Sequence, residues 1–433
     1  MRGLPVLALI AACGPGPRDD DLPDPIDLPP GVWEPAPGPD HHLVRVAASD
    51  GALWWVYVES TVIDELEDLY EHHTWLTQTT ATGEVLIEPT LVDPTSIPGL
   101  PSIGAQGDTV LVAITPNYGV PMYTRVFDRE GVAATPLPLA VELVANDHVV
   151  PPSGEAALAV SPTGRMRVVT AFSGATGDGE VAIVDLDDMG APLATTFVGT
   201  ADEAYKLRVA AAVRSDDAVV VAWDRVYEQC SGPRPAVTVS TAISSTVEPL
   251  SNIGDMPERG ELEPAIASID DTQYVAWVAN NYDAATRIAL ARYPDVTAPL
   301  ATFGTLGGWN TEPYVALASP DRGAVAWHVR DAMSAHDSVH VASFEVIAGV
   351  ARVSSPRAIE PVGESVRSLR GLVHVGDERY VVAWDEDTTV DRARTFAMQL
   401  DLSADERQRG VADLPPPFDG RVPARRSRIP CSH

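Results

Sequence analysis

The sequence predicts an all-β fold, a single β-propeller of four-stranded blades, with seven blades expected and six or eight as the alternatives. Three observations support this prediction. Short apolar runs recur along the chain with their last residues 50 to 58 positions apart. Each repeat reads as four short strands without helical periodicity, and the second strand is apolar on both faces. The seven runs are 55–58, 111–114, 169–172, 220–223, 274–277, 324–327 and 381–384.

The fifth repeat shows the expected order of strands and turns most clearly. A first strand spans 263–269, a turn at Asp270 and Asp271 follows, and a second strand spans 273–279. A loop at 280–285 leads to a third strand at 286–292 and a short fourth strand at 299–303. Four strands in about fifty residues match one blade of a propeller.

The second strand of this repeat carries large side chains on both faces. Val275 and Trp277 point one way, while Tyr274 and Val278 point the other way, because successive residues of a strand alternate. A sheet with one face in water would alternate apolar and polar residues. Both faces must therefore be covered, as they are when blades stack around an axis.

The turn between the first and second strands contains Asp or Gly in every repeat, because these residues tolerate the left-handed conformation. Two such turns, 161–164 (Ser-Pro-Thr-Gly) and 319–323 (Ser-Pro-Asp-Arg-Gly), resemble the Ser-Pro-Asp-Gly hairpin of TolB-like propeller repeats. The chain thus resembles a bacterial cell-surface propeller lipoprotein with degenerate repeats of the TolB or WD40 type. This resemblance concerns architecture and covers most of residues 42–414. The expected blades span about 42–96, 97–150, 151–205, 206–260, 261–310, 311–366 and 367–414.

The first thirteen residues read as a bacterial lipoprotein export signal. Arg2 supplies a positive charge, 4–12 is apolar, and the Ile-Ala-Ala-Cys run at 10–13 matches the lipobox, so Cys13 would carry the lipid. A buried first strand or helix is the alternative. Residues 14–41 are rich in Pro and Asp and predict a disordered, extended linker. These features predict an extracytoplasmic protein anchored to the outer membrane or cell surface through its lipid.

Two cysteines remain beyond the lipobox. Cys230 and Cys431 form a disulfide candidate, since an even pair in an oxidising compartment favours a bridge; two free thiols are the alternative. Residues 415–433 form a Pro/Arg-rich tail, which could contact anionic lipid or polysaccharide or lie on the acidic body.

The net charge of −31 argues against a nucleic-acid partner, because phosphate binding needs a basic surface. Apart from the export signal, no segment approaches the eighteen or more consecutive apolar residues of a membrane helix. We therefore expect a monomer that reaches the membrane only through its lipid anchor and meets an unidentified protein or glycan at the cell envelope.

The loops that follow the second strands are the polar parts of the repeats, and in a propeller they gather on one face. Their carboxylate, amide and tyrosine groups could bind sugars, peptides or cations, although exposed loops are polar in any protein. The ligand-binding candidates are Asp224, Arg225, Tyr227, Asn280, Tyr282, His328, Arg330, Asp385 and Asp387.

The sequence favours a non-catalytic ligand-binding or interaction scaffold. One alternative is a carbohydrate-active hydrolase or lyase with carboxylates at the channel mouth, for which Asp224 and Asp385 are the candidates. A second alternative is a purely structural envelope protein. We assign no catalytic residue and no metal site, and we expect no cofactor, with Ca²⁺ as a minor alternative in an acidic exported chain.

Overall fold

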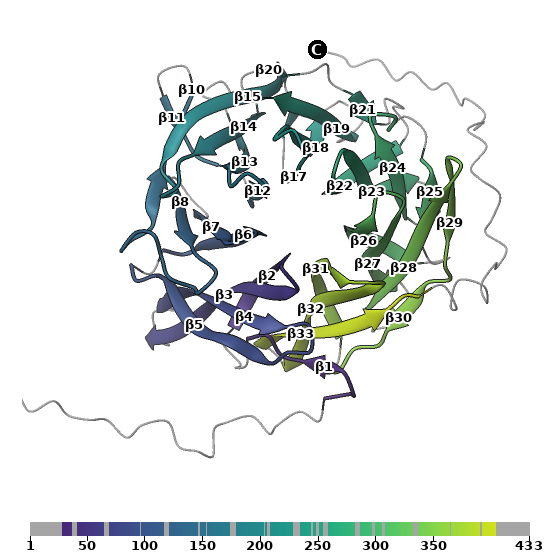
Figure 1. The fold of residues 1–433 in the computed structure, drawn as a ribbon, viewed down its shortest axis with the longest axis horizontal. Coiled ribbons are helices and arrows are strands. Elements are labelled where there is room, and N and C mark those ends of the chain that lie inside the picture. The colour runs from purple at the N-terminus through teal and green to yellow at the C-terminus, as the bar shows by residue number, and fades with distance from the viewer. Residues whose placement is uncertain are drawn as a thin grey trace, which may run out of the picture.

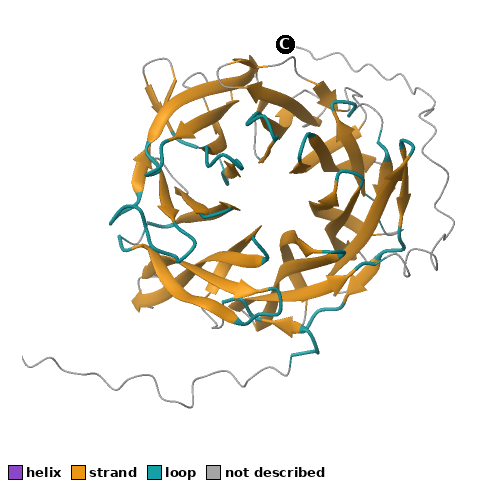
Figure 2. Cartoon of the chain, in the orientation of Figure 1, coloured by secondary structure: helices purple, strands orange, loops and turns teal. Residues whose placement is uncertain are grey.

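The computed structural model describes residues 28–403 apart from short stretches. Those stretches are 37–40, 65–68, 96, 117–120, 146–147, 153, 174–178, 203, 206–207, 228–233, 244–245, 248–250, 254–258, 282–285, 297–298, 305–307, 332–336, 364 and 390–391. Every regular element of the described residues is a strand, and no helix occurs among them. The strands form seven sheets of four to six strands and one two-stranded hairpin. Figures 1 and 2 show the sheets arranged around a central axis, which confirms the predicted all-β propeller.

We number the seven larger sheets in chain order. Sheet 1 contains β2 (His41–Ser49), β3 (Ala52–Asp64), β4 (Leu69–Thr80) and β5 (Val85–Asp93). Sheet 2 contains β6 (Gly99–Gln106), β7 (Thr109–Pro116), β8 (Met122–Phe127) and β9 (Leu139–Val141). The hairpin of β10 (Leu143–Ala145) and β11 (His148–Val150) follows. Sheet 3 contains β12 (Ala157–Val160), β13 (Met166–Ser173), β14 (Gly179–Leu186) and β15 (Pro192–Asp202).

The second half of the chain continues the pattern with small additions. Sheet 4 contains β16 (Ala204–Tyr205), β17 (Val209–Val213), β18 (Val219–Tyr227), β19 (Arg234–Ile243), β20 (Thr246–Val247) and β21 (Ser251–Ile253). Sheet 5 contains β22 (Arg259–Ile269), β23 (Thr272–Asn281), β24 (Arg287–Tyr293) and β25 (Ala301–Phe303). Sheet 6 contains β26 (Gly308–Ser319), β27 (Arg322–Asp331), β28 (Ser338–Ile347), β29 (Val350–Val353) and β30 (Arg357–Ile359). Sheet 7 contains β31 (Ser365–Gly376), β32 (Arg379–Thr389), β33 (Arg392–Asp401) and β1 (Val32–Trp33).

The innermost strands close a ring. They contact one another in the order β2, β6, β12, β17, β22, β26 and β31, and β31 returns to β2. Neighbouring strands pair antiparallel from the axis outward, as in β22–β23–β24–β25 of sheet 5. These four strands lie where the sequence predicts the four strands of the fifth repeat, with ends that differ by a few residues.

The second strands form the core between sheets, as their apolar pattern predicts. Val275 and Trp277 of β23 pack against Val220 of sheet 4. Tyr274 and Val278, on the opposite face, pack against sheet 6. Complete burial of one such side chain stabilises the fold by about 1.5–3 kcal/mol. Each sheet therefore shields both of its neighbours from water.

The turns between first and second strands use aspartate as expected. Asp50, Asp217, Asp270 and Asp377 have φ between 51° and 63°. Few residues other than glycine adopt this left-handed conformation, and aspartate is among those enriched there. The recurring aspartates are therefore explained by turn geometry.

The N-terminal segment corrects the predicted linker. Val32–Trp33, inside the range 14–41, forms β1 and pairs with Met398 and Ala397 of β33. Glu34 accepts two hydrogen bonds from Arg394, at 2.6 and 2.7 Å. The sequence did not predict this two-residue strand, because Pro and Asp dominate the composition of the segment around it. The last sheet thus takes its outer strand from the beginning of the chain.

Trp33 also contacts sheet 1. A Cβ added to Gly83 would lie 2.5 Å from Cγ of Trp33, so the indole occupies the space that only glycine leaves free. β1 therefore joins the first and last sheets of the ring. Among the described residues, no helix is long and apolar enough to cross a membrane.

Candidate functional site

The innermost strands of three sheets are kinked at the same place. Leu43, Glu263 and Glu312 have φ of 53°, 57° and 51°. The pairing register of each strand shifts there, which marks a β-bulge. A bulge bends a strand and re-aims its side chains. A left-handed non-glycine residue costs about 1–3 kcal/mol, so three such residues in corresponding positions indicate a functional or structural constraint at the axis.

A series of carboxylates links sheets 4, 5, 6 and 7. Asp224 of β18 accepts hydrogen bonds from the backbone N–H groups of Arg208, at 2.8 Å, and Glu263, at 3.4 Å. The Glu263 carboxylate accepts from the N–H of Glu312 at 2.6 Å. Glu312 in turn accepts from the N–H of Leu369 at 2.8 Å. Each carboxylate satisfies a backbone donor that the bulge or the next inner strand would otherwise leave unpaired.

Three arginines near the axis each lie against a carboxylate. Arg45 donates through Nε and Nη2 to the two carboxylate oxygens of Glu155, which joins sheet 1 to the start of sheet 3. The pair Arg370–Asp385 is 2.5 Å long and belongs to sheet 7.

The third arginine, Arg208, has its Nη2 3.6 Å from Oε1 of Glu263. Its side chain is 50% exposed, in contrast to 14–15% for Arg45 and Arg370. Arg208 is therefore the guanidinium of the axis that a ligand can reach without breaking a buried pair. We call the group of Arg45, Glu155, Arg208, Glu263, Glu312, Tyr314, Arg370 and Asp385 the axial cluster.

Tyr314 adds a neutral donor to the axial cluster. Burial raises the pKa of its hydroxyl, and the carboxylates of Glu155 and Glu312 raise it further. The guanidinium groups of Arg45 and Arg370 oppose this rise without cancelling it. At neutral pH Tyr314 is therefore protonated and can donate a hydrogen bond.

Glu312 is held in its charged form. Burial acts to raise the pKa of its carboxyl group, but the neighbours outweigh burial and bring the pKa to about 2. The imidazole of His328, whose Nδ1 lies 3.6 Å from the carboxylate, the N–H of Leu369 and the guanidinium of Arg208 lower the pKa. A group with this pKa is a poor general acid at neutral pH.

His328 lies between two carboxylates. Its side chain is 0% exposed, with Nδ1 3.6 Å from Glu312 and Nε2 3.4 Å from Asp337. Neither ring nitrogen has a hydrogen-bond partner among the residues that the structure describes. Because the two carboxylates face opposite nitrogens, a single metal ion cannot be bound by both and by the imidazole. Within the described residues, no group of three or more His, Cys, Asp or Glu side chains is arranged to hold a metal ion.

The structure places the nine predicted ligand-binding residues in different environments. Asp224, His328 and Asp385 lie beside or within the axial cluster, but they are buried at 2%, 0% and 1% exposure, which corrects their expected place on exposed loops. They are buried because they bond to backbone N–H groups or lie against charged side chains of the inner strands. Arg330 is exposed. The side chains of Arg225, Tyr227, Asn280 and Asp387, and all of Tyr282, Cys13, Cys230 and Cys431, lie outside the described residues.

Most of the axial cluster was missed by sequence reasoning, which looked at loops after the second strands. The cluster stands instead mainly on the innermost strands and on the residues that lead into them, with Asp385 on the second strand β32. One signal was available: Glu263-Pro264 and Glu312-Pro313 are the same dipeptide, each placed immediately before the apolar part of a first strand. Recurrence of a charged residue at a fixed place in the repeat predicts a shared role at the axis.

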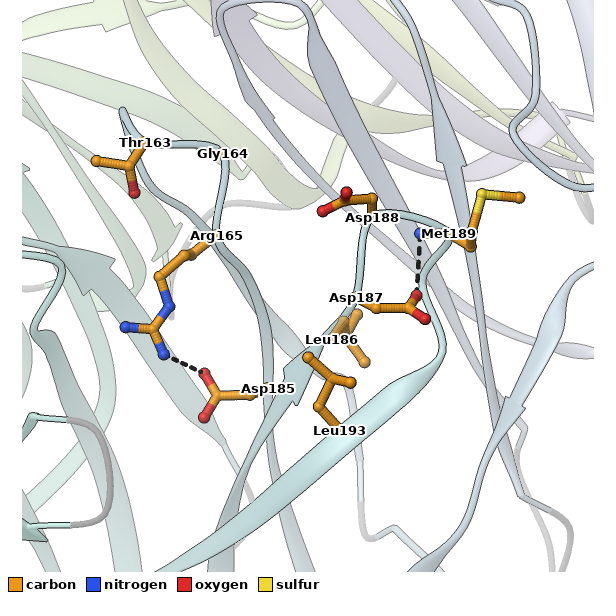
Figure 3. Close-up of a pocket in the computed structure, with 9 residues that line it drawn as sticks. All are labelled: Thr163, Gly164, Arg165, Asp185, Leu186, Asp187, Asp188, Met189 and Leu193. Atoms are coloured by element: carbon orange, nitrogen blue, oxygen red, sulfur yellow. Dashed lines mark hydrogen bonds and ion pairs between the residues drawn. The ribbon is translucent and has the colours of Figure 1, made fainter.

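Two hollows lie elsewhere on the molecule. A pocket of about 450 Å³ is formed where the inner strands of sheets 3, 4 and 5 end, lined by Val160, Val213 and Ile269 among others. A second pocket, of about 410 Å³, lies on sheet 3 and is shown in Figure 3. There Asp187 accepts from the N–H groups of Met189 and Ala191, at 2.9 and 2.8 Å, so its carboxylate completes a turn.

Comparisons with known proteins do not assign the chain to a family. No protein family and no curated protein matches the chain. Solved structures are similar to it at low identity. A protein of unknown function from Dyadobacter fermentans DSM 18053 is 12% identical, with 86% of this chain and 100% of that chain covered, at a TM-score of 0.48.

Two further similar structures act on carbohydrates according to their names. The polysaccharide lyase Uly1 is 9% identical, with 85% of this chain and 91% of that chain covered, at a TM-score of 0.48. An α-L-arabinanase from Penicillium chrysogenum is 11% identical, with 68% and 90% covered, at a TM-score of 0.41. At these identities and TM-scores the likeness carries no argument about the ligand or activity of this chain.

Proposed function

We propose that the chain is a lipid-anchored, extracytoplasmic propeller, with one blade for each of the seven sheets, that binds a polar ligand at its axis without catalysis. The accessible groups of the axial cluster support this proposal. Arg208 is 50% exposed and Glu155 is 34% exposed. Tyr314 supplies a neutral donor beside them. A few placed polar groups on rigid strands are typical of a binding site.

One observation carries the choice of binding over catalysis: the carboxylates at the axis already have partners. Glu263 and Glu312 accept backbone N–H groups, and Asp385 accepts from Arg370 and, at 2.6 Å, from Thr395. Asp224 accepts two backbone N–H groups. A glycosidase needs one carboxyl group that delivers a proton and another that is free to attack or to activate water. These carboxylates already bond to groups of their own and of neighbouring sheets.

The proposal is tested with the full chain carrying Cys13→Ser, so that it can be purified without lipid. This protein and its Arg208→Gln variant are applied to arrays of glycans and of peptides. We expect the Cys13→Ser protein to bind members of an array. The Arg208→Gln variant should bind them about tenfold or more weakly, because a charged hydrogen bond is lost. Arg357→Gln, an exposed arginine on the outer strand β30, is the matched control. Absence of binding on both arrays would overturn the proposal.

A second function, a carbohydrate-active hydrolase or lyase, is favoured by His328. An imidazole between Glu312 and Asp337 could move a proton if a substrate reached it. The test is incubation of the full chain with neutral and acidic polysaccharides, followed by measurement of reducing ends and of the ultraviolet absorbance of unsaturated products. Product that disappears in His328→Ala while the fold is retained would replace the binding proposal with this one.

The cellular location is a separate part of the proposal and rests on the lipobox at 10–13. Expression in a bacterium supplied with labelled palmitate should label the full chain and leave Cys13→Ala unlabelled. Equal labelling of both forms would show that Cys13 carries no lipid, and it would leave the proposed axial site unaffected.

A further inference from the structure

Trp309 stands apart from the tryptophans that build the core. Its side chain is 55% exposed, whereas Trp277 and Trp327 of the second strands are 1% and 0% exposed. Leaving so large an apolar side chain in water forgoes the stabilisation that burial would give. The corresponding position in sheet 5, three residues before the bulge glutamate, is Gly260. The repeat itself therefore does not require an aromatic residue here.

The register of sheet 6 places Trp309 close to the axial cluster. Trp309 lies opposite Arg330, and Thr311 lies opposite His328, on the paired strands β26 and β27. Residues two apart on a strand share a face, so Trp309, Arg330 and His328 lie on one face of the sheet. This is the face on which His328 contacts Glu312 and Asp337.

Arg330 places an exposed guanidinium on the strand opposite this indole. It is exposed, and it makes no hydrogen bond or ion pair with the part of the chain that the structure describes. The chain has a net charge of −31 and carboxylates are abundant, yet none of the described carboxylates lies in an ion pair with this guanidinium. A planar guanidinium presents donors that match a carboxylate in a bidentate manner.

We propose that Trp309 and Arg330 form a carbohydrate subsite for an acidic sugar. The flat apolar face of the indole would stack on the C–H face of a pyranose ring, and the guanidinium of Arg330 would bind the carboxylate of a uronic acid. No covalent step is involved. The subsite rests on the proposed binding function and deepens it, because it extends the axial cluster to the rim of sheet 6 and names the class of ligand.

The test uses an array of neutral and uronic-acid oligosaccharides and of peptides, with the full Cys13→Ser chain and two further substitutions. We expect uronic-acid glycans to bind, and Trp309→Ala and Arg330→Gln each to bind them about tenfold or more weakly. Arg330→Gln should also reduce the preference for acidic over neutral glycans. Leu193→Ala, with a 68% exposed side chain on β15, and Arg357→Gln are the matched controls and should bind as the parent does.

The outcomes separate this inference from the proposed function. Because Trp309 and Arg330 are exposed, their variants should keep the circular dichroism spectrum and melting temperature of the parent. Loss of glycan binding in Arg208→Gln but not in Trp309→Ala or Arg330→Gln would overturn the subsite and leave axial binding in place. Binding of peptides alone would do the same. Binding of nothing by the parent would overturn both.

Discussion

The Glu263 carboxylate accepts a hydrogen bond of 2.6 Å from the backbone N–H of Glu312, the corresponding bulge residue of the next sheet. The same dipeptide, Glu-Pro, thus acts as acceptor in one sheet and as donor in the following one. The bond explains why a left-handed glutamate is retained at the axis. The conformational cost of the bulge is offset by a bond that joins two sheets of the ring.

Removal of this bond should destabilise the ring. Glu263→Ala leaves the N–H of Glu312 without its acceptor, and an unsatisfied buried donor costs about 1–3 kcal/mol. We expect the free energy of unfolding in urea to fall by about that amount. Glu88→Ala, on the exposed outer strand of sheet 1, should change it by less than about 0.5 kcal/mol. Equal stability of the two variants would show that the carboxylate series does not hold the sheets together.

Stability should also depend on pH through Glu312. Its pKa in the folded protein, about 2, lies below its ordinary value of 4.5, so the carboxylate stabilises the fold above the ordinary value. This contribution, about 3 kcal/mol at most, is lost as the pH falls from about 5 toward 2.

The measurement compares the parent with Glu312→Gln, which lacks the titrating group. Melting temperatures are recorded at intervals between pH 7 and pH 2. The parent should melt at a higher temperature than Glu312→Gln near neutrality, and this difference should become smaller in acid. A difference of constant size over this range would mean that Glu312 does not supply the pH dependence.

The N-terminal strand should be needed to complete the last sheet. Deletion of residues 28–36 removes β1 and the Glu34 partner of Arg394, and it leaves β33 as an unpaired edge strand. We expect a lower melting temperature and concentration-dependent aggregation, because open edges pair with other chains. Deletion of residues 14–27, which leaves β1 in place, is the control. It should keep the melting temperature of the parent and should not cause aggregation.

The two kinds of tryptophan should respond differently to truncation. Trp277→Ala opens a cavity between sheets 4 and 5 and should cost about 3–5 kcal/mol of unfolding free energy. Trp309→Ala removes an exposed side chain and should cost less than about 0.5 kcal/mol. Chemical denaturation of both variants checks this contrast. A large loss in Trp309→Ala would indicate that Trp309 packs structurally, against the assignment of a binding role.

The architecture could be predicted from the sequence because the second strands repeat a local signal. Val275 and Trp277 alternate with Tyr274 and Val278 within one short strand, and this pattern recurs at nearly constant spacing. Periodicity of this kind depends only on neighbours along the chain, so it survives without knowledge of tertiary contacts.

The axial cluster could not be predicted in the same way, since its partners are distant in sequence. Arg45 and Glu155 are 110 residues apart, and the arrangement of sheets 1 to 3 around the axis brings them together. The contribution of β1 was missed for a related reason: Val32 and Trp33 are two apolar residues in a proline-rich segment, and their role appears only when β33 is beside them.

The most direct test of axial, non-catalytic binding is a calorimetric titration with the strongest ligand found on the arrays. The full Cys13→Ser chain and its Arg208→Gln variant are titrated, and the ligand is then recovered for mass spectrometry. We predict a dissociation constant about tenfold or more higher for Arg208→Gln, with the ligand recovered intact from both proteins. Equal dissociation constants would contradict the axial site, and a cleaved ligand would contradict the absence of catalysis.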